Sequence, residues 1–139
     1  MSVLIVSRTD FQQMADERLS EAKLLLDAGK WSGAYYLAGY AVELALKACV
    51  IKMVMATDAF PSKTLSKDCY VHDSRTLLGL LKLDDETRVD PNVAANWSVV
   101  RLWSEEKRYH RVTHPEAELL YLAITDPTYG VLPWIKSRW

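Results

Sequence analysis

The residues best suited to chemistry lie together in one short segment. Two arginines, a lysine and two histidines surround a single tyrosine: Lys107, Arg108, Tyr109, His110, Arg111 and His114. Cationic side chains attract phosphate and an aromatic ring can stack on a base, so this composition suits binding of a nucleotide or single-stranded RNA. Glu105 and Glu106 directly precede the segment and reduce its local charge. A merely solvated, charged loop therefore explains the composition equally well.

Other chemical sites have weaker support in the sequence. Cys69 and His72 have the spacing of half a zinc site, but no second pair with suitable spacing follows, so we expect no metal. Nucleophilic catalysis by the same two residues would need a spatial arrangement that spacing does not define. There is no glycine-rich phosphate loop, and we expect no cofactor. We expect His72 and Asp73 to start a short helix, with the histidine in a polar niche.

The element that must position these residues is residues 31–55, predicted to form one helix about 37 Å long. Small side chains recur along it every three or four residues and form a stripe that lets a second helix approach closely: Ala34, Ala38, Ala41, Ala45 and Ala48. Tyr36, Tyr40, Glu43 and Lys47 share the opposite side, where Glu43 and Lys47 form an i,i+4 pair. Because these two charges interrupt the apolar run, we expect no membrane span.

A second helix should precede the central one and pack against it. Its apolar repeat begins near Asp10, after a capping box of Thr9 with Gln12, and ends at Gly29, which suits a left-handed stop. Since only a residue or two separates the helices, they must run antiparallel as a hairpin.

The rest of the chain reads as shorter helices joined by polar segments. We expect a loop over 57–71, a helix from 73 or 74 to 82, a polar connection over 84–89, a helix from Pro91 to about 104, a polar segment to 113, and a helix capped by Thr113 with Glu116. At Asp126 and Pro127 the chain either restarts a helix or bends, and a kink is expected near Pro133. No segment alternates as a strand does. The predicted fold is all-α, a single domain over residues 1–139 built as a bundle of about five helices around the central hairpin.

Composition limits the possible functions. The 139 residues are half apolar and a quarter charged with a net charge of −1, so attraction to nucleic acid must come from a local patch. Five Trp and seven Tyr suggest an exposed aromatic surface of the kind used between subunits. Two cysteines cannot build a disulfide framework, and the apolar run 3–6 is too short for a signal-peptide core. We therefore expect a cytoplasmic homodimer.

Several stretches together resemble one known family. They are RLSEAKLLL at 18–26, Gly29, AYYLA at 34–38, AVELALKA at 41–48, then His72-Asp73 before a leucine-rich helix, Trp103, Arg108-Tyr109 and Trp134-Ile-Lys. In this order they resemble a HEPN domain over nearly the whole chain. The resemblance implies a small helical bundle, commonly dimeric. Some such domains are ribonucleases of toxin–antitoxin or defence systems, often paired with a minimal nucleotidyltransferase, and others are nucleotide-binding or adaptor modules.

The resemblance also implies candidate catalytic residues. Active members carry an arginine, four to six residues, and a histidine, a pattern that Arg108 and His114 match. Metal-free RNA cleavage needs a base for the 2′-hydroxyl and a cation for the charge that develops on phosphate. At a helix N-terminus near Arg108 and Arg111, the imidazole of His114 is expected to be neutral and able to accept a proton.

Three functions follow from the sequence. The first is a dimeric binding or regulatory module that recognises a nucleotide, RNA or a partner nucleotidyltransferase through residues 107–114. The second is a metal-independent ribonuclease using Arg108 and His114. The third is a dimeric scaffold whose aromatic excess is all interface. In a purely structural interpretation, Arg108 anchors its loop through a carboxylate such as Glu105 or through a neighbouring helix end, and His114 only occupies the first turn of a helix.

Overall fold

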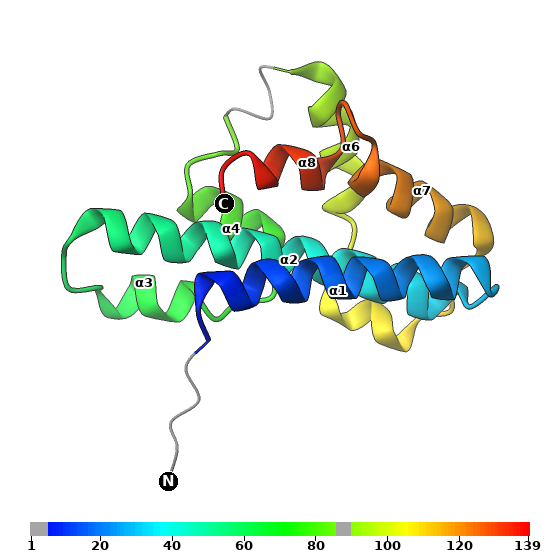
Figure 1. Ribbon diagram of the computed structural model, residues 1–139, viewed down its shortest axis with the longest axis horizontal. Coiled ribbons are helices and arrows are strands. Elements are labelled where there is room, and N and C mark those ends of the chain that lie inside the picture. Colours follow the sequence, from blue (N-terminus) through cyan, green and yellow to red (C-terminus); the bar gives the residue numbers. More distant parts are fainter. Residues whose placement is uncertain (1–5, 86–89) are drawn as a thin grey trace, which may run out of the picture.

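The computed structural model describes residues 6–85 and 90–139. Within these ranges the chain forms α-helices, one 3-10 helix and loops, and no strand, which confirms the predicted all-α class. The two longest helices, α1 (Arg8–Asp27) and α2 (Trp31–Thr57), lie side by side as the predicted antiparallel hairpin (Figure 1). The predicted connection over 84–89 lies partly outside the described residues.

The turn of this hairpin is the one expected from Gly29. Its φ of +77° is left-handed, and the amide of Lys30 donates to the carbonyl of Leu25 at 2.8 Å, closing the end of α1. The start of α1 differs from the prediction. Ser7 is the cap, since it accepts from the amide of Asp10 while the Asp10 carboxylate accepts from the amide of Ser7. The predicted box of Thr9 with Gln12 is wrong because a carboxylate in the first turn also gains from the helix dipole.

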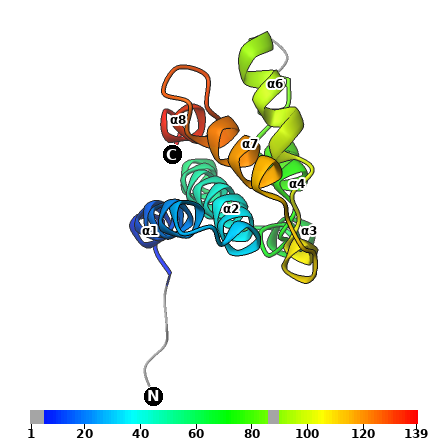
Figure 2. The same cartoon turned by 90° about the vertical axis from the view of Figure 1, so that its right-hand side faces the viewer.

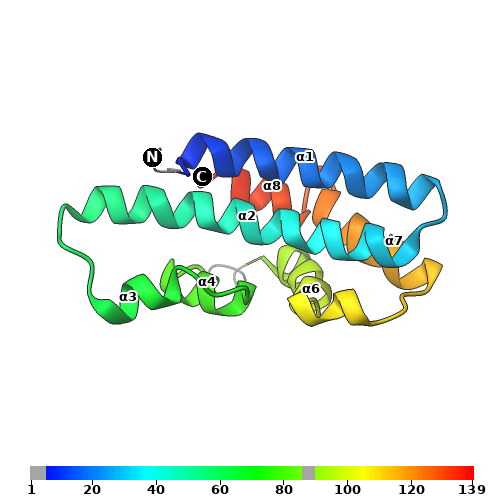
Figure 3. The ribbon, with the colours of Figure 1, turned by 90° about the horizontal axis from the view of Figure 1, so that it is seen from below.

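Helix α2 is the centre of the molecule. Seen along its length, it has α1 on one side, α7 (His114–Thr125) and α8 (Val131–Lys136) on a second, and the 3-10 helix η1 (Glu105–Tyr109) and α4 (Ser74–Leu80) away from α1 (Figures 2 and 3). All five stripe alanines are buried, none more than 3% exposed. No described helix is long and apolar enough to cross a membrane.

The chain between α2 and η1 departs from the prediction in two places. The expected loop over 57–71 contains a short helix, α3 (Lys63–Asp68), capped by Ser62; six residues are too few to show a helical repeat. Helix α6 (Pro91–Val100) begins as predicted, with Asp90 as cap and proline first, but it stops at Val100 instead of about 104. Helix α4 follows its Asp73 cap as expected.

The chain turns between α7 and α8, and α8 itself is not kinked. The predicted capping box of Thr113 with Glu116 starts α7. Asp126 does not cap a new helix; its carboxylate accepts from the amides of Thr128 and Tyr129 and makes a turn, after which α8 begins at Val131. The kink expected near Pro133 is wrong, because Pro133 is the third residue of α8 and amides of the first turn have no partner within the helix.

One glycine of α2 sets how the segment after α6 docks. A Cβ at Gly39 would lie under 3.0 Å from three atoms of the Trp103 indole, so the ring rests directly on the helix backbone. Trp103 is 6% exposed and also contacts the ring of Tyr36, with centroids 5.8 Å apart. The absence of a side chain at this position therefore permits the close approach.

We predict that Gly39→Ala lowers the free energy of unfolding by about 1–3 kcal/mol, because the added methyl must displace Trp103. Gly79→Ala on α4 is the matched control. A Cβ there meets nothing within 4 Å, so that protein should be unchanged or up to about 1 kcal/mol more stable. Urea denaturation measures both, and equal effects of the two substitutions would contradict the close approach.

Candidate functional site

The predicted chemical residues lie on a segment fixed to α2 at both ends. At its start, Trp103 packs on Gly39. At its end, Val112 is 9% exposed and its amide donates to the Ser32 hydroxyl at 2.9 Å. Between these anchors the chain forms η1 and a short extended stretch beside the first half of α2 (Figure 3). Two anchors on one rigid helix hold the intervening residues at the surface in a defined place.

Arg108 is exposed and is held by aromatic rings. Its guanidinium carbon lies 5.0 Å from the ring centroid of Tyr109. The polar interaction with the Tyr109 hydroxyl, and then that with the Tyr36 hydroxyl, raise the pKa of Arg108 further above its usual value. The structural interpretation that Glu105 anchors Arg108 is wrong, because the Glu105 carboxylate turns toward His72. Arg108 is thus a permanent cation supported by tyrosines.

His114 is the first residue of α7 and has two contacts. Its ring stacks on Trp31 of α2, with centroids 4.2 Å apart and planes 13° from parallel. Its Nε2 lies 3.2 Å from a carboxylate oxygen of Glu118, one helical turn later. The expectation of a neutral imidazole considered the helix N-terminus and nearby arginines but omitted this carboxylate. The side chain remains 55% exposed, so the oriented imidazole is accessible to a ligand.

No described contact joins Arg108 to His114. Their supports on α2, Tyr36 and Trp31, are five residues apart, which is about 140° around the helix and about 7.5 Å along it. The two side chains therefore interact with different residues of α2.

The remaining predicted ligand residues flank Arg108. We call residues 107–111 the basic ridge: Lys107, Arg108, Tyr109, His110 and Arg111. Tyr109 is 77% exposed, His110 and Arg111 are exposed, and Lys107 is half-buried. No carboxylate of residues 6–85 and 90–139 forms an ion pair with Lys107, Arg108 or Arg111. The ridge therefore presents cations that are free to meet an anion.

Comparison with known families accounts for this arrangement of helices. A family model for the HEPN domain matches residues 9–118, most of the chain. The chain belongs to the HEPN domain family. The match includes the hairpin, the basic ridge and His114, while α8 follows it. No curated protein and no solved structure matches the chain.

This HEPN domain also has a buried carboxylate that sequence reasoning underestimated. Glu43 lies in the middle of α2 and is only 1% exposed. Both of its oxygens lie 3.1 Å from Nδ1 of His72, and one lies 3.4 Å from Nζ of Lys47. Nε2 of His72 in turn lies 3.7 Å from a carboxylate oxygen of Glu105 on η1. The Glu43 carboxylate therefore provides the polar environment that was expected for His72.

The pair of Glu43 with Lys47 was predicted, but its link to His72 and Glu105 was not. The signal available in the sequence was Glu43 itself. A carboxylate within an almost continuous apolar stretch will be buried, and a buried carboxylate needs more partners than one lysine. The identity of the second partner could not be read, because His72 is 29 residues away along the chain.

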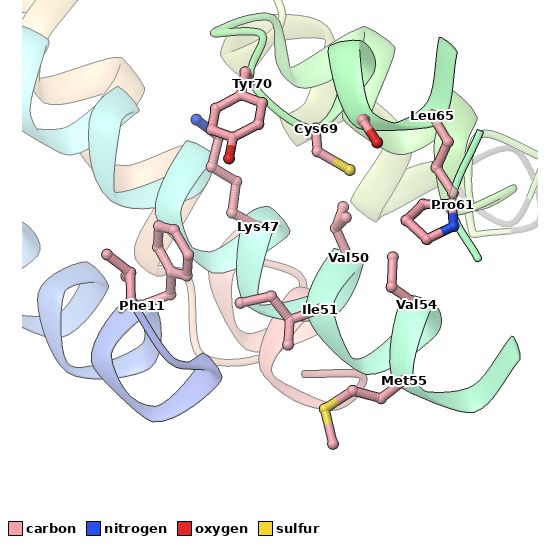
Figure 4. Close-up of a pocket in the computed structure, with 12 residues that line it drawn as sticks. Phe11, Lys47, Val50, Ile51, Val54, Met55, Pro61, Leu65, Cys69 and Tyr70 are labelled. Atoms are coloured by element: carbon pink, nitrogen blue, oxygen red, sulfur yellow. The ribbon is translucent and has the colours of Figure 1, made fainter. Parts of the chain in front are cut away.

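A groove lies at the end of the hairpin opposite its turn. It has a volume of about 650 Å³ and is lined mainly by apolar side chains of α2 and of residues 61–70, with Phe11 of α1 at one edge (Figure 4). Burial and then the Asp68 carboxylate raise the pKa of the Cys69 thiol in its wall. Burial raises the pKa of Cys49 to about 11. Both thiols are therefore protonated at neutral pH, which argues against the nucleophilic site considered for Cys69 with His72. The described residues contain no cluster of three potential metal ligands.

We predict that Glu43→Ala lowers the free energy of unfolding by about 3 kcal/mol or more, because it leaves Lys47 and His72 without their buried counter-charge. Glu118→Ala is the matched control. That carboxylate also contacts a histidine nitrogen but is 53% exposed, so its removal should cost less than about 1 kcal/mol. Urea denaturation at pH 7 compares the two, and similar losses would mean that Glu43 contributes no more than a surface pair.

Proposed function

We propose that this HEPN domain is a binding module that recognises single-stranded RNA, or a nucleotide as its smallest unit, through the basic ridge. The observation that carries the proposal is the unpaired cations of Lys107, Arg108 and Arg111 beside the exposed ring of Tyr109. Guanidinium groups bind phosphate through their fixed donors, and a tyrosine ring stacks on any base. The turn of Glu105 toward His72 supports the proposal, since it removes one of the two carboxylates expected to dilute the ridge.

The experiment is binding of a fluorescent 12-nucleotide oligouridine, followed by anisotropy over a range of salt. Arg108→Ala with Arg111→Ala should weaken binding about tenfold at low salt. It should also reduce the slope of log affinity against log salt by about 1.4, the value for two phosphate contacts on a single strand. Tyr109→Ala should cost about 1–3 kcal/mol of stacking.

Lys63→Ala with Lys67→Ala is the control for net charge. These two lysines lie exposed on α3, away from the ridge, and their removal changes the charge by the same amount. If this variant binds as weakly as the ridge variant, binding is unspecific attraction and the ridge is not the site. A ridge that fails to bind RNA but captures a nucleotidyltransferase would point to the partner that the family resemblance also implies.

A second candidate function is metal-independent RNA cleavage by Arg108 and His114. The observation that favours it is the orientation of His114, whose ring is fixed between Trp31 and Glu118 yet remains accessible. In this function His114 would accept the proton of the 2′-hydroxyl, and Arg108 would stabilise the charge that develops on phosphate.

The same oligonucleotides test cleavage in the presence of a chelator. A ribonuclease should lose activity in both Arg108→Ala and His114→Ala, while His114→Ala still binds RNA. Intact RNA with the wild-type protein, under conditions where a metal-independent ribonuclease is active, would leave binding as the function.

We also propose that the protein is a homodimer joined at the groove end of the hairpin. Large apolar side chains protrude there, with Phe60 99%, Tyr70 81% and Met55 72% exposed. Because exposed Phe60 directly precedes Pro61 in the wall of the groove, two copies related by a twofold axis could each place this ring in the groove of the other. Exposed apolar surface of this kind favours subunit contact.

Light scattering tests the dimer against the chain mass of 15.8 kDa. The wild type should have twice this mass, and Phe60→Asp should shift it toward the monomer by placing a charge in the interface. Leu24→Asp on α1 is the control, because Leu24 is 69% exposed but lies near the opposite end of the hairpin. A greater effect of Leu24→Asp would place the interface elsewhere.

Both cysteines are free thiols, Cys49 buried and Cys69 half-buried. Free thiols persist in a reducing compartment, and we propose on this basis that the protein acts in the cytoplasm.

A further inference from the structure

Glu105 is the only residue of η1 with an ion pair among the described residues, and that pair points inward. Its carboxylate meets Nε2 of His72, whose other ring nitrogen faces the buried Glu43. The three residues form a chain from the core of α2, through the loop before α4, to the beginning of the basic ridge. His72 and Glu105 are about half exposed, at 46% and 44%, while Glu43 is buried.

The protonation state of His72 determines to how many carboxylates its ring can donate a proton. A neutral imidazole has one N–H donor, whereas an imidazolium has two. With one carboxylate at each ring nitrogen, only the imidazolium offers a proton to both. The shorter contact with Glu43, at 3.1 Å, is a hydrogen bond, and the contact with Glu105, at 3.7 Å, is an ion pair.

The neighbouring charges act in both directions. Glu43 on α2, Glu105 on η1 and Asp73 next in the chain attract the imidazolium, and Lys47 on α2 opposes it. Tyr40 lies near Glu43 but stays neutral, since burial and then the charge of Glu43 raise the pKa of this tyrosine. When His72 loses its proton, it keeps its bond to Glu43, and Glu105 loses its attraction to α2. The carboxylate is then free to turn toward the ridge and repel phosphate.

We propose that His72 is a positioning residue for the basic ridge: as an imidazolium it draws Glu105 toward α2, which orders η1 and removes a negative charge from the binding surface. The inference rests on the proposed RNA-binding function of the ridge. RNA binding should therefore weaken when His72 is replaced by a residue that cannot draw Glu105 toward α2.

A double-mutant cycle of His72→Gln and Glu105→Gln tests the proposal through oligouridine affinity. His72→Gln should weaken binding about threefold while Glu105 is present, as expected for a partly exposed ion pair, and should have little effect in Glu105→Gln. Additive effects of the two substitutions would overturn the proposal.

Hydrogen exchange of the free protein separates this inference from the proposed function. The amides of Lys107 and His110 are bonded within the segment, and that of Val112 is bonded to Ser32. Their protection, corrected for intrinsic exchange, should be about threefold lower in His72→Gln than in the wild type. If RNA does not bind but protection changes in this way, the proposed function fails and the role of His72 stands. Unchanged protection in His72→Gln would refute that role whether or not RNA binds.

Discussion

The close approach of other elements to α2 is the constraint on which the rest of the structure depends. Alanines line its contact with neighbouring helices, and Gly39 gives the Trp103 ring direct access to its backbone. Small residues lower the distance between packed elements and so raise the number of favourable contacts. They also leave little room for adjustment, because a well-packed core does not absorb an added methyl. The position of the basic ridge therefore depends on Gly39, where α2 has no side chain and Trp103 can pack on its backbone.

A charge within this dense core needs compensation, and its partners come from separate parts of the chain. Glu43 is buried at the centre of α2, and its counter-charges come from the same helix, through Lys47, and from the loop before α4, through His72. Replacing such a group by a hydrophobic residue can be neutral for stability in other proteins. Its retention here is consistent with a role in fixing where the loop and η1 sit, which apolar packing alone does not specify.

The sequence was sufficient wherever structure is determined locally. The stripe of alanines, the left-handed Gly29 and the caps Asp73, Asp90 and Thr113 predicted the hairpin and the start of three helices, because each signal acts within one or two turns. Prediction from the sequence failed where the local structure depends on residues that are distant along the chain. Helix α6 ends at Val100 and Trp103 packs on Gly39, and Arg108 and His114, six positions apart, interact with different residues of α2. Neither relation has a counterpart in spacing or periodicity.

The two anchors of the ridge have a consequence for how such a domain can change over time. Trp103 and Val112 tie the segment to α2 by contacts that do not involve the exposed side chains between them. The exposed residues between Glu105 and Val112 can therefore be exchanged, lengthened or recharged with little effect on the folding of the bundle, provided that the two anchors are kept. The binding segment of this domain can change while the helical bundle stays the same, so a new ligand preference could evolve without a new fold.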